Sequence, residues 1–160
     1  MDIPELTAVR RPESPALVPL ISALGIYRGR HMQARERALP TGHAQLLVNL
    51  AADELWSHPD GERQGRHTPG AALLGAATRP AVIDTAHQRA VLWVAFRPGG
   101  AYPFFDLPAS AVHGLLVPLV DLWGRDGATL RERLLASPSA AGMLRVVEAV
   151  LLARAVRPLE

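Results

Sequence analysis

Histidine is the side chain of this sequence best suited to hold a catalytic metal ion. Imidazoles on a strand reach one ion when they alternate, because every second residue faces the same side. The six histidines are isolated from one another instead: His31, His43, His58, His67, His87 and His113. We therefore predict no metal site and no cofactor. The alternative is a metal-dependent enzyme acting on a small metabolite, whose ligands only tertiary folding would bring together.

Covalent and acid–base catalysis find no supporting pattern either. No serine lies in a Gly-x-Ser-x-Gly turn, and cysteine and lysine are both absent. The neighbouring carboxylates Asp53 and Glu54 point to opposite sides of an extended chain, so they do not converge. We predict no catalytic residue and a protein that is not an enzyme.

Polar and aromatic side chains on apolar strand segments are the candidates for binding a small molecule, since ligand pockets are mostly apolar with a few polar anchors. We expect five residues to line such a pocket: Tyr27, Gln45, Asn49, Trp93 and Phe96. Trp93 and Phe96 are rivals, because they fall on opposite faces of one strand.

The sequence Phe96-Arg97-Pro98-Gly99-Gly100 ends the last apolar strand segment and leads into a helical region. Arg97 could pair with a carboxylate such as Asp121, or bind the carbonyl groups at a helix end. We predict a structural junction formed by Arg97, Gly99, Gly100, Asp121 and Trp123.

Short apolar segments separated by turns predict strands before residue 100 and helices after it. We expect strands near 26–27, 35–39, 43–51, 71–75, 81–85 and 90–96, and an exposed loop over 57–70. Helices are expected at 109–116, 118–123, 129–136 and 138–156, with a capping box at Thr129 and an N-cap at Ser137. The prediction is one α+β domain: an extended N-terminal arm (1–15), a small β-barrel or sandwich (16–100) and a helical part packed on it (101–160).

The last predicted helix carries an apolar stripe of Met143, Val147, Val150 and Leu151, with Arg145, Glu148 and Leu152 on another face. The stripe could be buried against the strands or form a two-fold homodimer interface. The helix is too apolar for the base-reading element of a helix-turn-helix, so no DNA-binding module is predicted here.

Charge and hydropathy restrict the other partners. All 17 basic residues are arginines and the net charge is only +2. The basic stretch of Arg28, Arg30, His31, Arg35 and Arg37 contains Glu36 and no aromatic residue, which favours a solvated loop over a phosphate-binding site. No apolar run approaches the roughly 20 residues of a membrane span, so we expect a cytoplasmic protein.

Several motifs, in order and spacing over roughly 35–155, resemble an N-terminal domain found before the DNA-binding modules of AraC-type bacterial regulators. They are Leu39-Pro40-Thr41-Gly42, Gln45 to Leu50, Leu74-Gly75, Val94 to Gly100, Pro118 to Gly124 and Leu130 to Leu134. Thr41 and His43 depart from the pattern around the first turn, which weakens any ligand contact shared there.

The resemblance implies a cupin-like β-barrel joined to helices, acting as an effector-sensing or dimerisation domain. It implies a small-molecule effector, a homodimer, and contact with DNA only through a helix-turn-helix module absent from this sequence. The sequence is then expected to be a regulator cut at a domain boundary or a stand-alone relative, with a metal-dependent cupin-type enzyme as the alternative.

Overall fold

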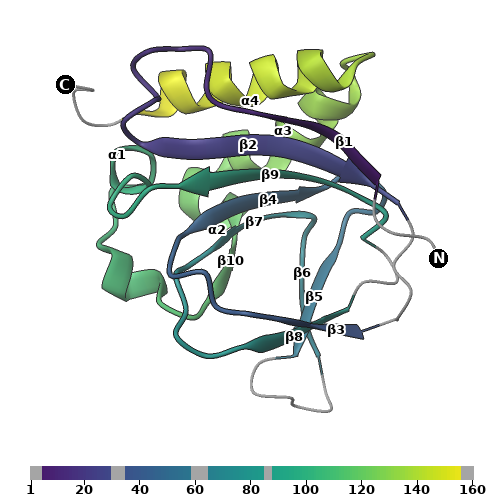
Figure 1. The fold of residues 1–160 in the computed structure, drawn as a ribbon, viewed down its shortest axis with the longest axis vertical. Coiled ribbons are helices and arrows are strands. Elements are labelled where there is room, and N and C mark those ends of the chain that lie inside the picture. The colour runs from purple at the N-terminus through teal and green to yellow at the C-terminus, as the bar shows by residue number, and fades with distance from the viewer. Residues whose placement is uncertain (1–4, 30–34, 59–64, 85–87, 156–160) are drawn as a thin grey trace.

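A computed structural model describes residues 5–29, 35–58, 65–84 and 88–155 and confirms the α+β class, with strands preceding helices (Figure 1). The strands are β1 (Glu5–Arg10), β2 (Ile21–Arg28), β3 (Arg35–Ala38), β4 (Gln45–Asn49), β5 (Leu55–His58), β6 (Arg66–Thr68), β7 (Ala71–Leu74), β8 (Ala81–Asp84), β9 (Ala90–Phe96) and β10 (Leu116–Pro118). The helices are α1 (Tyr102–Phe105), the 3-10 helix η2 (Ala109–Val112), α2 (Leu119–Trp123), α3 (Arg125–Leu135) and α4 (Ala140–Arg154).

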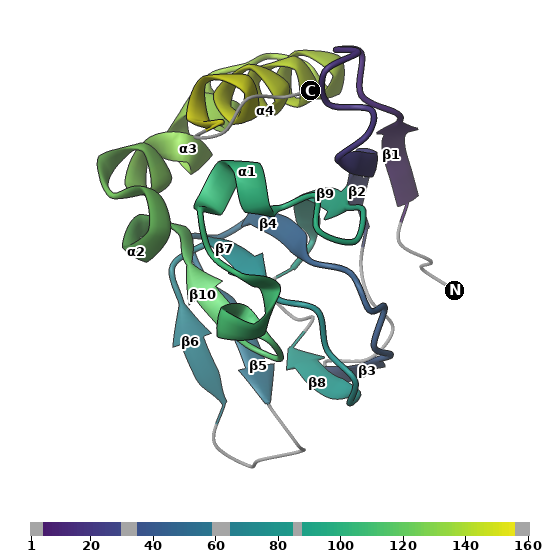
Figure 2. The ribbon, with the colours of Figure 1, turned by 90° about the vertical axis from the view of Figure 1, so that its left-hand side faces the viewer.

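The strands form two antiparallel sheets. The large sheet has the order β1-β2-β9-β4-β7-β10 and the small sheet the order β3-β8-β5-β6. The helices cover one side of the large sheet, and the small sheet lies on its other side (Figure 2). Within the described residues no ladder joins the two sheets into a closed barrel, so the structure supports two facing sheets followed by helices.

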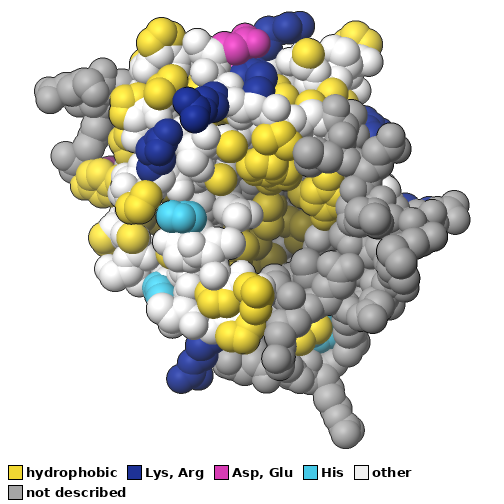
Figure 3. Space-filling model, viewed as in Figure 1, with side chains coloured by type: hydrophobic (Ala, Val, Ile, Leu, Met, Phe, Trp, Pro, Cys, Tyr) yellow, Lys and Arg dark blue, Asp and Glu magenta, His cyan; other side chains and the backbone are white. Residues whose placement is uncertain are grey.

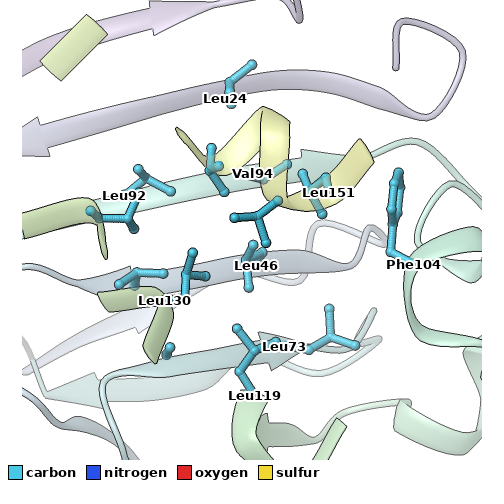
Figure 4. Packing of buried hydrophobic residues seen from close by; sticks show 14 of the residues in the cluster. Leu24, Leu46, Leu73, Leu92, Val94, Phe104, Leu119, Leu130 and Leu151 are labelled. Carbon is cyan, nitrogen blue, oxygen red and sulfur yellow. The ribbon is translucent and has the colours of Figure 1, made fainter. Parts of the chain in front are cut away.

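The main core lies between the large sheet and the helices. Alternate residues of the large sheet's strands face it, including Leu92 and Val94 of β9 and Leu46 of β4, while Leu130 and Leu151 enter from α3 and α4 (Figure 4). All five side chains are fully buried, and each contributes on the order of 2 kcal/mol through removal from water. This burial holds the helices on the sheet.

Four strands were not predicted: β1, which lies in the expected extended arm, and β5, β6 and β10. β5 and β6 lie in or beside the stretch predicted as an exposed loop. The Pro, Gly and charged residues of this stretch are typical of loops, so its two very short paired segments were missed. β10 follows Gly100, where only helices were expected. It has three residues and ends in Pro118, which an edge strand tolerates because its outer N–H needs no ladder partner.

Two predicted helix starts are wrong. α3 begins at Arg125, so Thr129 lies inside it and donates its hydroxyl to the Arg125 carbonyl at 3.0 Å instead of capping a helix. The N-cap of α4 is Ser139, which accepts from the Gly142 amide at 3.0 Å, so the cap lies two residues after Ser137. The helix ends at Arg154, and the predicted end at residue 156 lies outside the described residues.

The N-terminal segment, expected as an extended arm, supplies the edge strand β1 and is fastened to α4. Glu148, which helical spacing places on a different face from the apolar stripe, is only 5% exposed. Its carboxylate contacts the Arg10 guanidinium at 2.7 Å and accepts from the amides of Glu13 at 2.8 Å and Ser14 at 3.2 Å. The apolar stripe of α4 is buried as well, so those residues do not form a dimer surface.

Candidate functional site

A cavity of about 540 Å³ lies between the two sheets. Its walls come from β2, β4, β7, β9 and β10 on one side and from β5 and β6 on the other. The lining residues are Tyr27, Gln45, Leu47, Leu55, Trp56, Ser57, Arg66, Thr68, Leu74, Gln88, Val91, Trp93, Gly114, Leu115 and Leu116. The surface is hollowed in the middle of one face, with hydrophobic side chains deep in the hollow (Figure 3).

The large sheet separates this cavity from the helical core, because successive residues face opposite sides of a strand. On β9, Val91 and Trp93 line the cavity, whereas Leu92, Val94 and Phe96 belong to the core cluster. Of these two alternatives, Trp93 therefore lines the cavity and Phe96 does not.

Trp93 is placed by a glycine. Its cross-strand neighbours are Gly25 on β2 and Leu47 on β4. A Cβ atom at Gly25 would lie 2.8 Å from Cζ2 of the indole and 2.6 Å from the Ala8 carbonyl oxygen. Only glycine at position 25 allows the Trp93 ring to lie this close to the backbone of β2.

Gln45 brings a polar group to the apolar side of the cavity. Its direct cross-strand neighbours are Ala95 on β9 and Leu74 on β7. The side chain is half-buried, and its amide makes no hydrogen bond to any described residue. An amide carries both donors and an acceptor, so this position can meet either kind of ligand group.

Few charged groups line the cavity. Among the lining residues that the structure describes, the ionisable side chains are Arg66, which is exposed, and the phenol of Tyr27. No carboxylate or imidazole belongs to this described part of the lining. The cavity therefore offers an apolar environment with hydroxyl and amide groups.

Two predicted lining residues lie elsewhere. Asn49 is buried at the end of β4, where its Oδ1 accepts from the Ala51 and Ala52 amides at 3.0 and 3.2 Å and its Nδ2 donates to the Glu54 carbonyl at 2.8 Å. Phe96 packs on the helical side against Phe104 and Phe105, with ring centroids 5.8 and 6.0 Å away. Tyr27, Gln45 and Trp93 do line the cavity.

Sequence reasoning missed most of the apolar wall and the whole contribution of the small sheet. Val91 could have been found, because it alternates with Trp93. Leu47 could have been found in the same way from Gln45. Ser57, Arg66 and Thr68 could not, since their segment was taken for a loop.

The predicted junction after β9 is built from backbone contacts. Arg97 donates from Nε to the Val18 carbonyl at 3.0 Å, whereas Asp121 is exposed on α2. Gly99 has φ +74°, a conformation that favours glycine, and a Cβ at Gly100 would collide with the Leu20 carbonyl. Arg97 thus holds the turn before β2, and no ion pair joins it to Asp121 within the described residues.

Trp123 connects the junction to the helices. Its indole Nε1 donates to the Phe104 carbonyl at 3.0 Å, and its ring stacks on Phe105 with centroids 5.0 Å apart. The Arg154 guanidinium lies 5.4 Å from the ring centroid, at the end of α4. The buried tryptophan therefore fastens α1, α2 and α4 together.

The histidines were also placed partly wrongly. His58, expected in an exposed loop, is buried, whereas His67 contacts Glu54 at 3.6 Å and the ring of Trp56 at 4.9 Å. Nowhere in the described part of the chain do three or more histidine, aspartate or glutamate side chains gather as metal ligands would. His31 and His87 lie outside the described residues, as does Arg30 of the basic stretch.

The match to a known family covers all the described residues that line the cavity, together with Arg97, Gly99 and Gly100 of the junction. Residues 10–118 match a domain of unknown function, DUF6597. The chain belongs to this family. No curated protein and no solved structure matches the chain. None of the described helices is both long and apolar enough to cross a membrane.

Proposed function

We propose that this DUF6597 chain is the effector-sensing and dimerisation domain of an AraC-type transcription regulator and has no catalytic role. The observation that carries the proposal is the cavity of about 540 Å³ between the sheets, which falls within the size range of small-molecule pockets. Its apolar wall and few polar groups suit binding without chemistry.

We regard the two facing sheets as an opened form of a cupin-like barrel. β10, at the edge of the large sheet, contacts β6, at the edge of the small one. The two edges approach each other around the cavity without pairing, as in a barrel whose wall is interrupted.

The large sheet offers a short route from an effector to the helices. Gln45 and Leu47 face the cavity, whereas Leu46 and Val48 of the same strand face the helical core. At the end of this strand Arg131 of α3 donates from Nε to the Asn49 carbonyl at 2.8 Å and from Nη2 to the Leu50 carbonyl at 3.3 Å. A shift of β4 on ligand binding would therefore move α3.

Contact with DNA is assigned to a helix-turn-helix module outside this sequence. α3 and α4 follow one another closely, but α4 buries Met143, Val147 and Leu151 against the rest of the protein. The basic residues of α4 are Arg145 and Arg154 alone, and Arg154 contacts Trp123 and Asp126, so the helix lacks the polar exposed face with which a recognition helix reads bases.

We place the homodimer contact on the helical layer. Val120, Leu135 and Leu152 are large hydrophobic side chains that remain about two-fifths exposed on α2, α3 and α4. A second copy packed on these helices would bury them and bring the two C-terminal helices together.

A reporter experiment tests the dimer. The chain is fused to a monomeric DNA-binding domain that represses its operator only when dimeric. We expect repression by the wild-type fusion, loss of repression with Leu152→Glu, and retention with the control Leu39→Glu, which alters a loop residue that is 75% exposed. A wild-type fusion that fails to repress would contradict the proposed function, and repression that survives Leu152→Glu would contradict the assigned surface.

A further inference from the structure

We infer that the ligand of the cavity is an uncharged molecule with a flat apolar body and one hydrogen-bonding group, and that Gln45 recognises that group. The inference rests on the proposed effector-binding function. It identifies the chemical class of effector and the residue that selects it.

The body of the ligand follows from the walls. Leucine and tryptophan side chains from both sheets, together with Val91, surround the space, and the charged side chain among the described lining residues, Arg66, is exposed. Burying apolar ligand surface against such walls is favourable by about 25 cal/mol per Å². A molecule made mostly of carbon therefore gains most from entering.

We infer a flat ligand from the position of Trp93. The six-membered ring of its indole lies against Gly25, with Cζ2 and Cε2 at 2.8 and 3.1 Å from the position of a Cβ there. The ring is thus part of the wall and does not project across the cavity. An aromatic ligand would be able to stack on or pack edgewise against it, which adds to the gain from burial.

The absence of ligand charge follows from the cost of burial. A buried cation needs a carboxylate partner, and none of the lining residues that the structure describes carries one. Among the same described residues an anion would find Arg66 alone, and pairing with this exposed side chain would draw the ligand out of the apolar part of the cavity. An uncharged ligand incurs neither cost.

The hydrogen-bonding group follows from Gln45. This residue stands between Ala95 and Leu74 in the middle of the large sheet, and its amide has no partner among the described residues. A ligand hydroxyl or amide can both donate to its oxygen and accept from its nitrogen. Gln45 therefore selects for a neutral polar group at one place on an apolar molecule.

The test uses four probes that share one ring system: naphthalene, 2-naphthol, 2-naphthoate and 2-naphthylmethylammonium. Titration calorimetry on the wild-type chain should rank 2-naphthol tightest and the ammonium weakest, with at least a tenfold difference between them. Gln45→Met should weaken 2-naphthol about fivefold, which corresponds to one neutral hydrogen bond, and leave naphthalene unchanged.

Each contrary outcome is informative. Tightest binding of the carboxylate or the ammonium probe overturns the uncharged class, and an equal loss for naphthol and naphthalene in Gln45→Met overturns the role of Gln45. The wild-type ranking needs no variant, so a misfolded Gln45→Met leaves the test intact. If no probe bound in calorimetry but the reporter fusion still repressed, this inference would be overturned and the proposed dimerisation would stand. If naphthol bound but the fusion did not repress, the proposed function would fail and the ligand class would stand.

Discussion

Replacement of Glu148 by alanine should destabilise the protein more than any other carboxylate substitution on its helices. The side chain is 5% exposed and serves three partners in the N-terminal segment. Its loss leaves the guanidinium of Arg10 without its closest carboxylate and two backbone amides without an acceptor. The segment that carries β1 would then be held mainly by its pairing with β2.

The size of the effect can be worked from this geometry. Removing one partner of a buried ion pair costs about 3–5 kcal/mol. Arg10 keeps 23% of its side chain exposed, and Glu13 lies 3.8 Å from its Nε, so solvent and a second carboxylate compensate in part. We therefore expect about 2–4 kcal/mol for Glu148→Ala, and about 1–2 kcal/mol for Glu148→Gln, which keeps an oxygen acceptor.

Urea unfolding followed by circular dichroism measures these differences. The matched control is Glu132→Ala, which removes an exposed carboxylate from α3 and should change the free energy of unfolding by no more than about 0.5 kcal/mol. Combining Glu148→Ala with Arg10→Met should reveal a coupling of about 1–2 kcal/mol. A Glu148→Ala protein as stable as the control would refute the reasoning, as would zero coupling.

Four further substitutions test other contacts by the same urea assay. Ser139→Ala should lower the free energy of unfolding by about 1 kcal/mol, because it removes the N-cap of α4, and Ser137→Ala should lower it by less. The reverse order would show that Ser137 is the N-cap, as the sequence predicted. Arg131→Met should cost about 1–2 kcal/mol by releasing the end of β4, and no loss would remove the proposed link to α3. Gly25→Ala should cost about 1–3 kcal/mol and shift tryptophan fluorescence by moving Trp93; unchanged emission would contradict the close packing.

The alternation of strand residues was enough to predict part of the site but not the choice between its faces. Val91, Trp93, Leu92 and Phe96 are all hydrophobic, because the large sheet is covered on both sides. Only the helices on one side and the small sheet on the other decide that Trp93 faces the cavity. Which face of β9 lines the cavity depends on tertiary packing, and the periodicity of a strand carries no information about that packing.

Asn49 shows how local chemistry can compete with a predicted role. It ends β4, and its short amide side chain folds back on the following backbone, as asparagine commonly does in turns. Glu148 shows the opposite case, because helical spacing places it on one face with Arg145 and Leu152. Its actual partner, Arg10, is remote in the sequence, so no local pattern could have predicted the buried pair.

The small sheet was the largest omission from the predicted site. β6 has three residues and carries Arg66 and His67, which read as loop residues when taken alone. Its strand character comes from pairing with β5, where Leu55 faces Thr68 across the ladder. The cavity needs both sheets, so the sequence could predict candidate residues without predicting the enclosed space.

Native mass spectrometry of the purified chain, with and without 2-naphthol, tests ligand binding and dimerisation in one experiment. We predict a homodimer that carries no stoichiometric transition metal and takes up one naphthol per chain. A stoichiometric transition metal would contradict it and favour a metal-dependent cupin-type enzyme. A monomer would contradict the proposed dimerisation, and a chain that takes up no naphthol would contradict the inferred class of ligand.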